Sequence, residues 1–223
     1  MEKFIFGSAE YESYMREHEH ERGERAFLES IAEEGMIAAD VGAQYGPAAC
    51  AVSRAIGPSG KLFCFEPIPE YREHLEENIK SSGLTNVEVI PSAVGRHAGE
   101  AKLHIDGGGT SIVPKEGKKT FTAEVVSLDD FFEARGVGRL DLIGMDCEGS
   151  ELFVLQGAQK LLTTNSVKVF AEIHHGFLKE LGFSARDIVR FLEGLGYTSW
   201  SVSLSDLSRG QDWDACDYLF ASR

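Results

Sequence analysis

The stretch that decides the fold is MIAADVGAQYG, residues 36–46. Its first half, residues 36–41, is a short apolar run that is typical of a buried strand. Gly42 permits a tight turn after this strand, and Gly46 lets a helix begin close to a ligand. Pro47 suits the first turn of that helix, which we expect over residues 47–56. A buried strand, a glycine turn and a helix are the opening unit of a parallel α/β sheet.

The same alternation continues along the chain. We expect further buried strands at residues 61–65, 86–90, 140–145 and 167–173, and further helices at 71–81, 150–162 and 185–195. Residues 101–105 and 121–126 alternate apolar and polar side chains, as half-exposed antiparallel strands do. Residues 197–204 and 217–221 fit a closing antiparallel pair, and loops are expected at 106–118 and 175–184.

The sequence therefore predicts a doubly wound, Rossmann-like α/β fold with about seven main strands. The sheet is expected to be mostly parallel with an antiparallel C-terminal strand, and to carry an inserted β-hairpin. Residues 20–34 have a helical pattern with Phe27, Leu28 and Ile31 on one face. We therefore predict an N-terminal helical extension over residues 1–34, followed by a single domain over residues 35–223.

Composition narrows the class of protein. The 223 residues carry 22 Lys and Arg against 36 Asp and Glu, a formal net charge of −14. Nucleic acids and anionic membranes are bound largely through Lys and Arg, so neither is an expected partner. No run approaches the ~18 apolar residues of a membrane span. The four cysteines form no C-x-x-C pair, and we expect a soluble protein of the reducing cytoplasm.

A cofactor site is expected at the carboxyl ends of the strands. Glu66 ends the second strand, where a carboxylate can accept two hydrogen bonds from a ribose diol. The loop over residues 42–46 has the spacing G-x-x-x-G, which differs from the G-x-G-x-x-G of dinucleotide sites. Asp40 adds negative charge, which suits the sulfonium and ammonium groups of S-adenosylmethionine better than a pyrophosphate. The alternatives are a nicotinamide-dependent oxidoreductase, or glycines and an acid that only shape a βα turn.

A second group of polar residues follows the later strands. Asp146 and Glu148 come after the fourth main strand, and Glu172, His174 and His175 come after the fifth. Because strand residues alternate sides, at most one of the two histidines should face the site. Carboxylates near a helix start also stabilise the helix dipole, and we assign Glu151 mainly to that role.

With these motifs, the sequence resembles the FkbM family of methyltransferases. The resemblance lies in DVGAQYG (residues 40–46), FEPIP (65–69), DLIGMDCEGSE (141–151) and VLQGA (154–158), and it covers residues 36–175. Three positions depart from the family pattern: Gln44 for Asn, Gly144 for Lys and Cys147 for Val. Gly144 removes a cation from the carboxylate cluster.

The resemblance implies S-adenosylmethionine as cofactor and O-methylation of a hydroxyl on a small molecule or sugar. With the charge argument above, the expected cofactor contacts are Asp40, Gly42, Gln44, Gly46, Glu66, Ser92, Ala93 and Asp146. Ser92 and Ala93, just past the third strand, are expected to flank the adenine. No sequence feature indicates an oligomeric state.

The acceptor hydroxyl needs a general base or a bound metal to lose its proton. Our candidates for the catalytic residues are Asp146, Glu148, Glu172 and His174. Mg²⁺ bound to the three carboxylates is the alternative, because Mg²⁺ prefers oxygen ligands. Gly144 keeps a second alternative open, a catalytically inactive module that retains cofactor binding.

Overall fold

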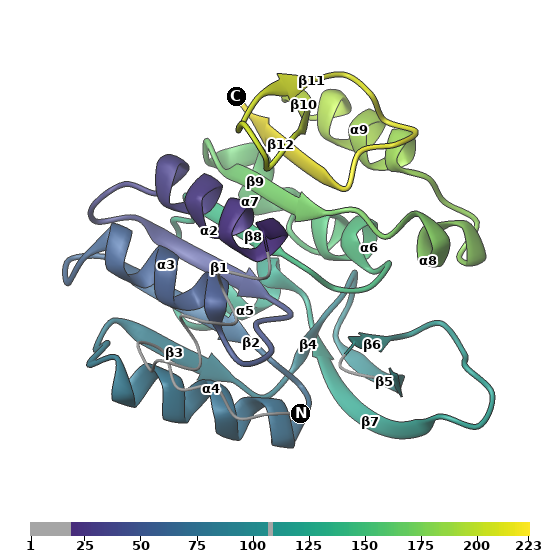
Figure 1. Ribbon diagram of the computed structural model, residues 1–223. Coiled ribbons are helices and arrows are strands. Elements are labelled where there is room, and N and C mark those ends of the chain that lie inside the picture. Colours follow the sequence, from purple (N-terminus) through teal and green to yellow (C-terminus); the bar gives the residue numbers. More distant parts are fainter. Residues whose placement is uncertain (1–18, 107–108) are drawn as a thin grey trace.

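An eight-stranded sheet forms the centre of the computed structural model, which describes residues 19–106 and 109–223 (Figure 1). In spatial order its strands are β11 (Arg209–Gly210), β10 (Thr198–Val202), β12 (Tyr218–Ser222), β9 (Lys168–Glu172), β8 (Leu142–Met145), β1 (Ile37–Val41), β2 (Lys61–Phe65) and β3 (Val87–Ile90). The five strands from β9 to β3 are parallel, and β12 lies antiparallel between β9 and β10. The predicted mostly parallel sheet with an antiparallel C-terminal strand is confirmed, and the two-residue strand β11 adds an eighth strand to the seven or so expected.

Helices cover both faces of this sheet, so the doubly wound prediction is also confirmed. One face carries α2 (Glu19–Ile31), α3 (Pro47–Ile56) and α4 (Pro69–Ser81). The other carries α5 (Leu128–Ala134), α6 (Glu151–Gln156), α7 (Gln159–Thr164), α8 (His175–Glu180) and α9 (Ala185–Gly194). Strand periodicity divides the core in two: Phe63 and Phe65 of β2 pack towards α5, whereas Leu62 and Cys64 pack towards α3.

The helix expected near the N-terminus is present as α2, and its predicted face is buried. Phe27, Leu28 and Ile31 are all buried. The Phe27 ring stacks on Phe170 of β9 at 5.0 Å and meets Phe220 of β12 edge-on at 5.5 Å. The division of the chain after residue 34 stays a prediction, and residues 1–18 of the predicted extension lie outside the described residues.

The inserted segment is larger than the predicted hairpin. Its main strands are confirmed as the antiparallel pair β5 (Gly99–Asp106) and β7 (Lys119–Val126). The expected loop at 106–118 is wrong in part, because β6 (Gly109–Ser111) pairs with β5 there. β4 (Ala93–Val94) pairs with β7 and completes a four-stranded sheet that lies beside the main one (Figure 1).

The single helix expected over residues 150–162 is wrong, because α6 and α7 are separate. The break falls at Gly157, where a Cβ would lie 2.1 Å from the carbonyl oxygen of Gly95. The Asp129 carboxylate then accepts hydrogen bonds from the backbone N–H groups of Lys160 and Leu161, at 2.8 and 2.9 Å. This carboxylate caps the start of α7 from a different helix, so the cause of the break is tertiary.

The expected loop at 175–184 is also wrong, because its first half forms α8. The backbone N–H of Leu178 donates to the carbonyl of His174, and the N–H of Leu181 to that of Phe177. Leu178 is fully buried against the core. This contact holds the short helix next to the end of β9.

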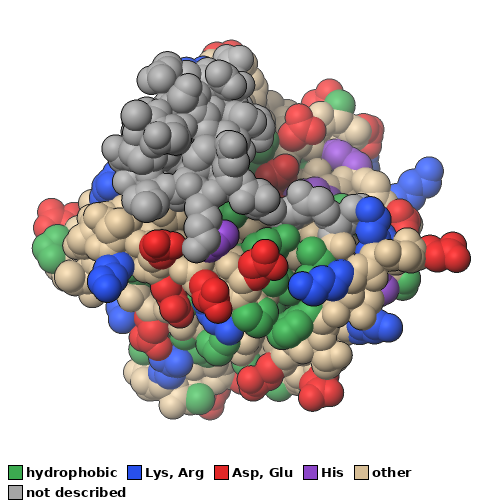
Figure 2. Space-filling view, turned by 60° about the horizontal axis from the view of Figure 1, so that its bottom comes forward, with side chains coloured by type: hydrophobic (Ala, Val, Ile, Leu, Met, Phe, Trp, Pro, Cys, Tyr) green, Lys and Arg blue, Asp and Glu red, His purple; other side chains and the backbone are tan. Residues whose placement is uncertain are grey.

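No helix within the described residues is long and apolar enough to cross a membrane. On the face shown in Figure 2, Lys and Arg side chains are mostly scattered among acidic ones, and hydrophobic side chains gather near the centre.

Candidate active site

The cavity that most of the predicted cofactor residues line, called the main cavity below, lies where the strand order reverses, beside the carboxyl ends of β1 and β8, as parallel α/β sheets favour. It has a volume of about 460 Å³. The loop after β1 contributes Gly42 and Gln44, β2 contributes Glu66, and the loop after β8 contributes Asp146 and Glu148. The far wall consists of apolar residues that include Ala93, Val94, Leu103, Ile112 and Phe153. A cavity with an apolar wall and a few convergent carboxylates suits a small-molecule ligand.

The loop after β1 owes its path to residues with positive φ. Gly42 has φ +85° and Gln44 has φ +49°. The N–H groups of Gly42 and Ala43 donate to the carbonyl of Phe65, which fastens this loop to the end of β2. A Cβ at Gly42 would lie 1.9 Å from the carbonyl oxygen of Asp146. Only glycine therefore fits between the ends of β1 and β8.

Glu66 is held in place by two backbone groups. Its Oε2 accepts from the N–H of Gln44 at 2.9 Å, and its Oε1 from the N–H of Ile68 at 2.8 Å. The residue is 4% exposed. Burial raises the pKa of Glu66 to about 7, although these two hydrogen bonds oppose the shift. Each oxygen retains a free lone pair, so the carboxylate can still accept hydrogen bonds from ribose hydroxyls.

Asp40 faces a smaller cavity of about 200 Å³ on the other side of the β1 loop. The residue is 7% exposed, and its Oδ2 has no hydrogen-bond partner among the described residues. Burial and the nearby charge of Glu66 raise the pKa of Asp40 to about 7. Gly144 lies beside Asp40 in the sheet, and a Cβ there would be 4.0 Å from the Asp40 Oδ1 and 3.7 Å from Leu28. A Cβ would therefore fit at position 144, and glycine adds no side chain to the cavity that it lines.

The remaining predicted cofactor residues differ in position. Ala93 lines the main cavity. Ser92 is buried and lies outside the lining of that cavity. Gly46 has φ +89° at the start of α3 and faces Leu75, so it shapes the loop from behind. Their roles in cofactor binding stay predictions.

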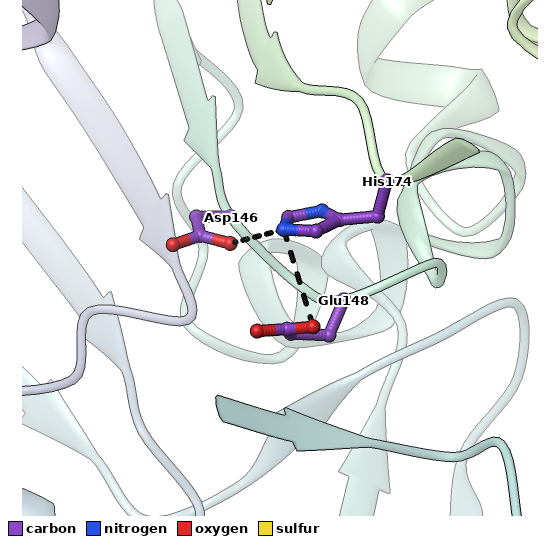
Figure 3. A group of neighbouring side chains, drawn as sticks. All are labelled: Asp146, Glu148 and His174. Carbon is purple, nitrogen blue, oxygen red and sulfur yellow. Dashed lines mark ion pairs between the residues drawn. The ribbon is translucent and has the colours of Figure 1, made fainter. Parts of the chain in front are cut away.

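The structure brings the four predicted catalytic residues together. His174 Nε2 lies 3.5 Å from Asp146 Oδ1, 3.7 Å from Glu172 Oε1 and 4.0 Å from Glu148 Oε2. Figure 3 shows the imidazole ring pointing between Asp146 and Glu148. Asp146 and Glu148 line both cavities, whereas Glu172 and His174 line the smaller one. The cluster therefore stands at the junction of the two cavities.

The charged groups of this cluster shift one another's pKa values. Burial alone would lower the pKa of His174, but a hydrogen bond with Glu151 and the charges of Asp146, Glu151 and Glu172 raise it to about 9. Partial desolvation and the charges of Glu172, Glu148 and Glu151 raise the pKa of Asp146, and His174 opposes this shift. His174 is 18% exposed, whereas the Asp146 side chain is 46% exposed. Asp146 therefore has room for a ligand at its open side.

His175 lies outside this cluster, as strand alternation predicts. Its Nε2 donates to the carbonyl of Cys216 at 2.8 Å. Glu151, in contrast, belongs to the cluster: its Oε1 lies 3.1 Å from His174 Nδ1. Glu151 lies in the first turn of α6, where a carboxylate favours the helix dipole as predicted, and it is also fully buried against the histidine, a contact that the prediction lacked.

The inserted sheet supports Glu148, which has an unusual backbone conformation at φ +49°. The hydroxyl of Ser111 on β6 donates to the carbonyl of Glu148 at 2.8 Å. A Cβ at Gly109, also on β6, would lie 2.3 Å from Glu148 Oε1. No sequence pattern predicts these contacts, because they depend on how β6 folds back onto the loop after β8.

Three residues of this site have the geometry to hold a metal ion. Among the described residues, Asp146, Glu148 and His174 bring one ligand atom each within 4.8 Å of one another. An imidazole nitrogen in this set suits transition metals better than Mg²⁺, which prefers oxygen. The Mg²⁺ alternative stays a prediction.

The donor set fits a particular type of ligand. Glu66 offers a carboxylate to a ribose, whereas Asp40 and Asp146 offer negative charge further along the same strand edge. A buried carboxylate oxygen without a partner, such as Asp40 Oδ2, lowers the stability of the fold unless a ligand pairs with it. S-adenosylmethionine combines a ribose with two positively charged groups. The fold and the site thus define the class of S-adenosylmethionine-dependent methyltransferases with a Rossmann-like fold.

The chain belongs to the methyltransferase FkbM domain family, whose model matches residues 40–199. The hexuronic acid methyltransferase AglP of Haloferax volcanii is 28% identical over 200 residues, which cover 86% of this chain and 76% of that protein. The 2-O-methyltransferase NoeI of Sinorhizobium fredii is 27% identical over 125 residues, 48% of this chain and 51% of that protein. The protein is therefore an S-adenosylmethionine-dependent methyltransferase.

Solved structures share the fold. An S-adenosylmethionine-dependent O-methyltransferase from Thermotoga maritima superposes with a TM-score of 0.51 at 14% identity, over 100% of this chain and 68% of that chain. An O-methyltransferase from Bacillus cereus, in complex with S-adenosylhomocysteine, superposes with a TM-score of 0.52 at 13% identity, over 91% of this chain and 80% of that chain. At these identities the comparison concerns the fold alone.

Proposed function

We propose that the protein methylates a hydroxyl group of a carbohydrate or another small molecule, with His174 as the general base. The observation that carries this proposal is the position of His174 Nε2 among three carboxylates at the junction of the two cavities. The names of two relatives, a hexuronic acid methyltransferase and a 2-O-methyltransferase, support a sugar hydroxyl as the acceptor.

The chain's own residues then have distinct tasks. Glu66 and the loop at Gly42 hold the adenosine part of the cofactor, and Asp40 attracts its positive end. When bound, S-adenosylmethionine would supply a methyl group for the oxygen nucleophile to attack, with S-adenosylhomocysteine as the leaving group. His174 Nε2 accepts the proton of the acceptor hydroxyl, and Asp146 orients that hydroxyl from its open side. Alignment of the two reactants supplies much of the acceleration, because the methyl group is already activated.

The proposal is tested by calorimetric titration with S-adenosylhomocysteine, followed by transfer of labelled methyl groups to a panel of sugars. We expect micromolar binding, and turnover on at least one neutral sugar, amino sugar or uronic acid. The titration and the methyl-transfer assay are each carried out with Mg²⁺ and with EDTA. Turnover that EDTA abolishes and Mg²⁺ restores would favour the metal alternative, and binding without turnover on any acceptor would favour an inactive module.

The pH dependence follows from the raised pKa of His174. The groups that face its imidazole are Asp146, Glu148, Glu151 and Glu172. With a pKa of about 9, only about 1% of His174 is neutral at pH 7. A base must be neutral, so kcat/KM should rise about tenfold per pH unit above pH 7 and level off near pH 9. A kcat/KM profile that is flat from pH 6 to 9 would show that another group accepts the proton.

We infer a cytoplasmic location as well, since all four cysteines, which lie within the described residues, are free thiols. Exclusion of nucleic acid as a partner stays a prediction that rests on the net charge of −14.

A further inference from the structure

Glu151 is the first residue of α6, and its carboxylate also makes a contact beyond that helix. Its Oε1 accepts a hydrogen bond from the N–H of Gly149 at 2.9 Å, two residues before, and lies 3.1 Å from His174 Nδ1. Its side chain is 0% exposed, and its Oε2 has no partner among the described residues. Burial of a carboxylate is costly without a charged or hydrogen-bonded partner. His174 is the basic residue that supplies one.

The contact determines which nitrogen of His174 carries a proton. A carboxylate can only accept at Nδ1, so the ring must donate from Nδ1–H. In the neutral ring, the lone pair then resides on Nε2. Nε2 is the atom that faces Asp146, Glu172 and Glu148 at the junction of the cavities.

We propose that Glu151 is a positioning residue for His174: it fixes the Nδ1–H tautomer and aims Nε2 at the acceptor hydroxyl. This inference rests on the proposed function, which assigns His174 as the base. The competing explanation is structural: Glu151 would serve only to tie the 146–151 loop together through Gly149.

Glu151→Gln separates these two explanations. The amide keeps the volume but not the charge, and the Oε1 position contacts both Gly149 and His174 Nδ1. With its oxygen at that position the amide offers Nδ1–H only an uncharged acceptor, and with its nitrogen there it donates to Nδ1 and favours the wrong tautomer. The kcat should therefore fall, by about 10²-fold where the wrong tautomer forms, while the Kd for S-adenosylhomocysteine stays within about threefold. In a His174→Asn background the same change should alter kcat by less than about twofold, because the two residues act as a unit. Independent, multiplicative losses would overturn the proposal.

Asp129→Asn provides the matched control. Asp129 also caps a helix start with its carboxylate, but it lies away from the cluster. Its replacement should lower the Tm and leave kcat unchanged.

A second measurement needs neither a variant nor an acceptor. In the unmodified protein labelled with ¹⁵N-histidine, above pH 10, His174 should show a protonated Nδ1 and an unprotonated Nε2. An Nε2–H tautomer would refute the positioning role even if no acceptor is ever found. Conversely, an Nδ1–H tautomer without any methyl transfer would leave the positioning geometry standing and count against the proposed function alone.

Discussion

Replacement of His174 by asparagine should lower kcat by about 10²–10⁴-fold, the usual contribution of a general base. Asparagine is a suitable substitute because its amide nitrogen can take the place of Nδ1 and still donate to Glu151. The variant thus removes Nε2 without leaving a buried carboxylate unpaired. The affinity for S-adenosylhomocysteine should remain within about threefold, since His174 lies outside the lining of the main cavity. Single-turnover assays with labelled methyl donor measure the loss.

His175→Asn is the matched control for this experiment. It changes the neighbouring histidine in the same way, but that ring bonds to the carbonyl of Cys216, away from the carboxylate cluster. Its kcat should stay within about twofold of the unmodified protein. A His174→Asn variant that retained full turnover would transfer the role of base to Asp146 or Glu172.

The sequence was sufficient to find four members of the cluster, Asp146, Glu148, Glu172 and His174, because each follows a buried strand. Strands buried on both faces are short apolar runs, and parallel strands present their carboxyl ends at one edge. Asp146, Glu172 and His174 could therefore be placed together from their positions alone. The same reasoning found Glu66 and the loop at Gly42.

The parts that the sequence did not predict depend on contacts between distant segments. A carboxylate beside a helix start is explained by the helix dipole whether or not it has another partner. The sequence position of Glu151 therefore could not predict its contact with His174. The break between α6 and α7 comes from Asp129, about 30 residues earlier in the chain. The apolar wall of the main cavity includes Leu103 and Ile112 from the inserted segment, whose alternating pattern predicts strands but not where they pack.

Gly42→Ala should abolish cofactor binding and destabilise the protein strongly. The added Cβ would lie 1.9 Å from the carbonyl oxygen of Asp146, in a backbone conformation with φ +85°. A left-handed conformation alone costs alanine about 1–2 kcal/mol, and relief of the clash must also move β1 away from β8. We expect a loss of about 3–5 kcal/mol in the free energy of unfolding, and a Tm lower by roughly 10 °C. Thermal unfolding and calorimetry with S-adenosylhomocysteine check both effects.

Gly83→Ala separates the two causes of that loss. Gly83 also has a positive φ, +66°, but nothing lies within 4 Å of the Cβ that alanine would add. Gly83→Ala should therefore lower the free energy of unfolding by only about 1–2 kcal/mol, the cost of the left-handed conformation, and leave cofactor binding unchanged. If Gly42→Ala were no worse than Gly83→Ala, the ends of β1 and β8 would have to separate easily. In that case the close approach of Gly42 to Asp146 would not be the contact that keeps the loop after β1 aligned with the catalytic cluster.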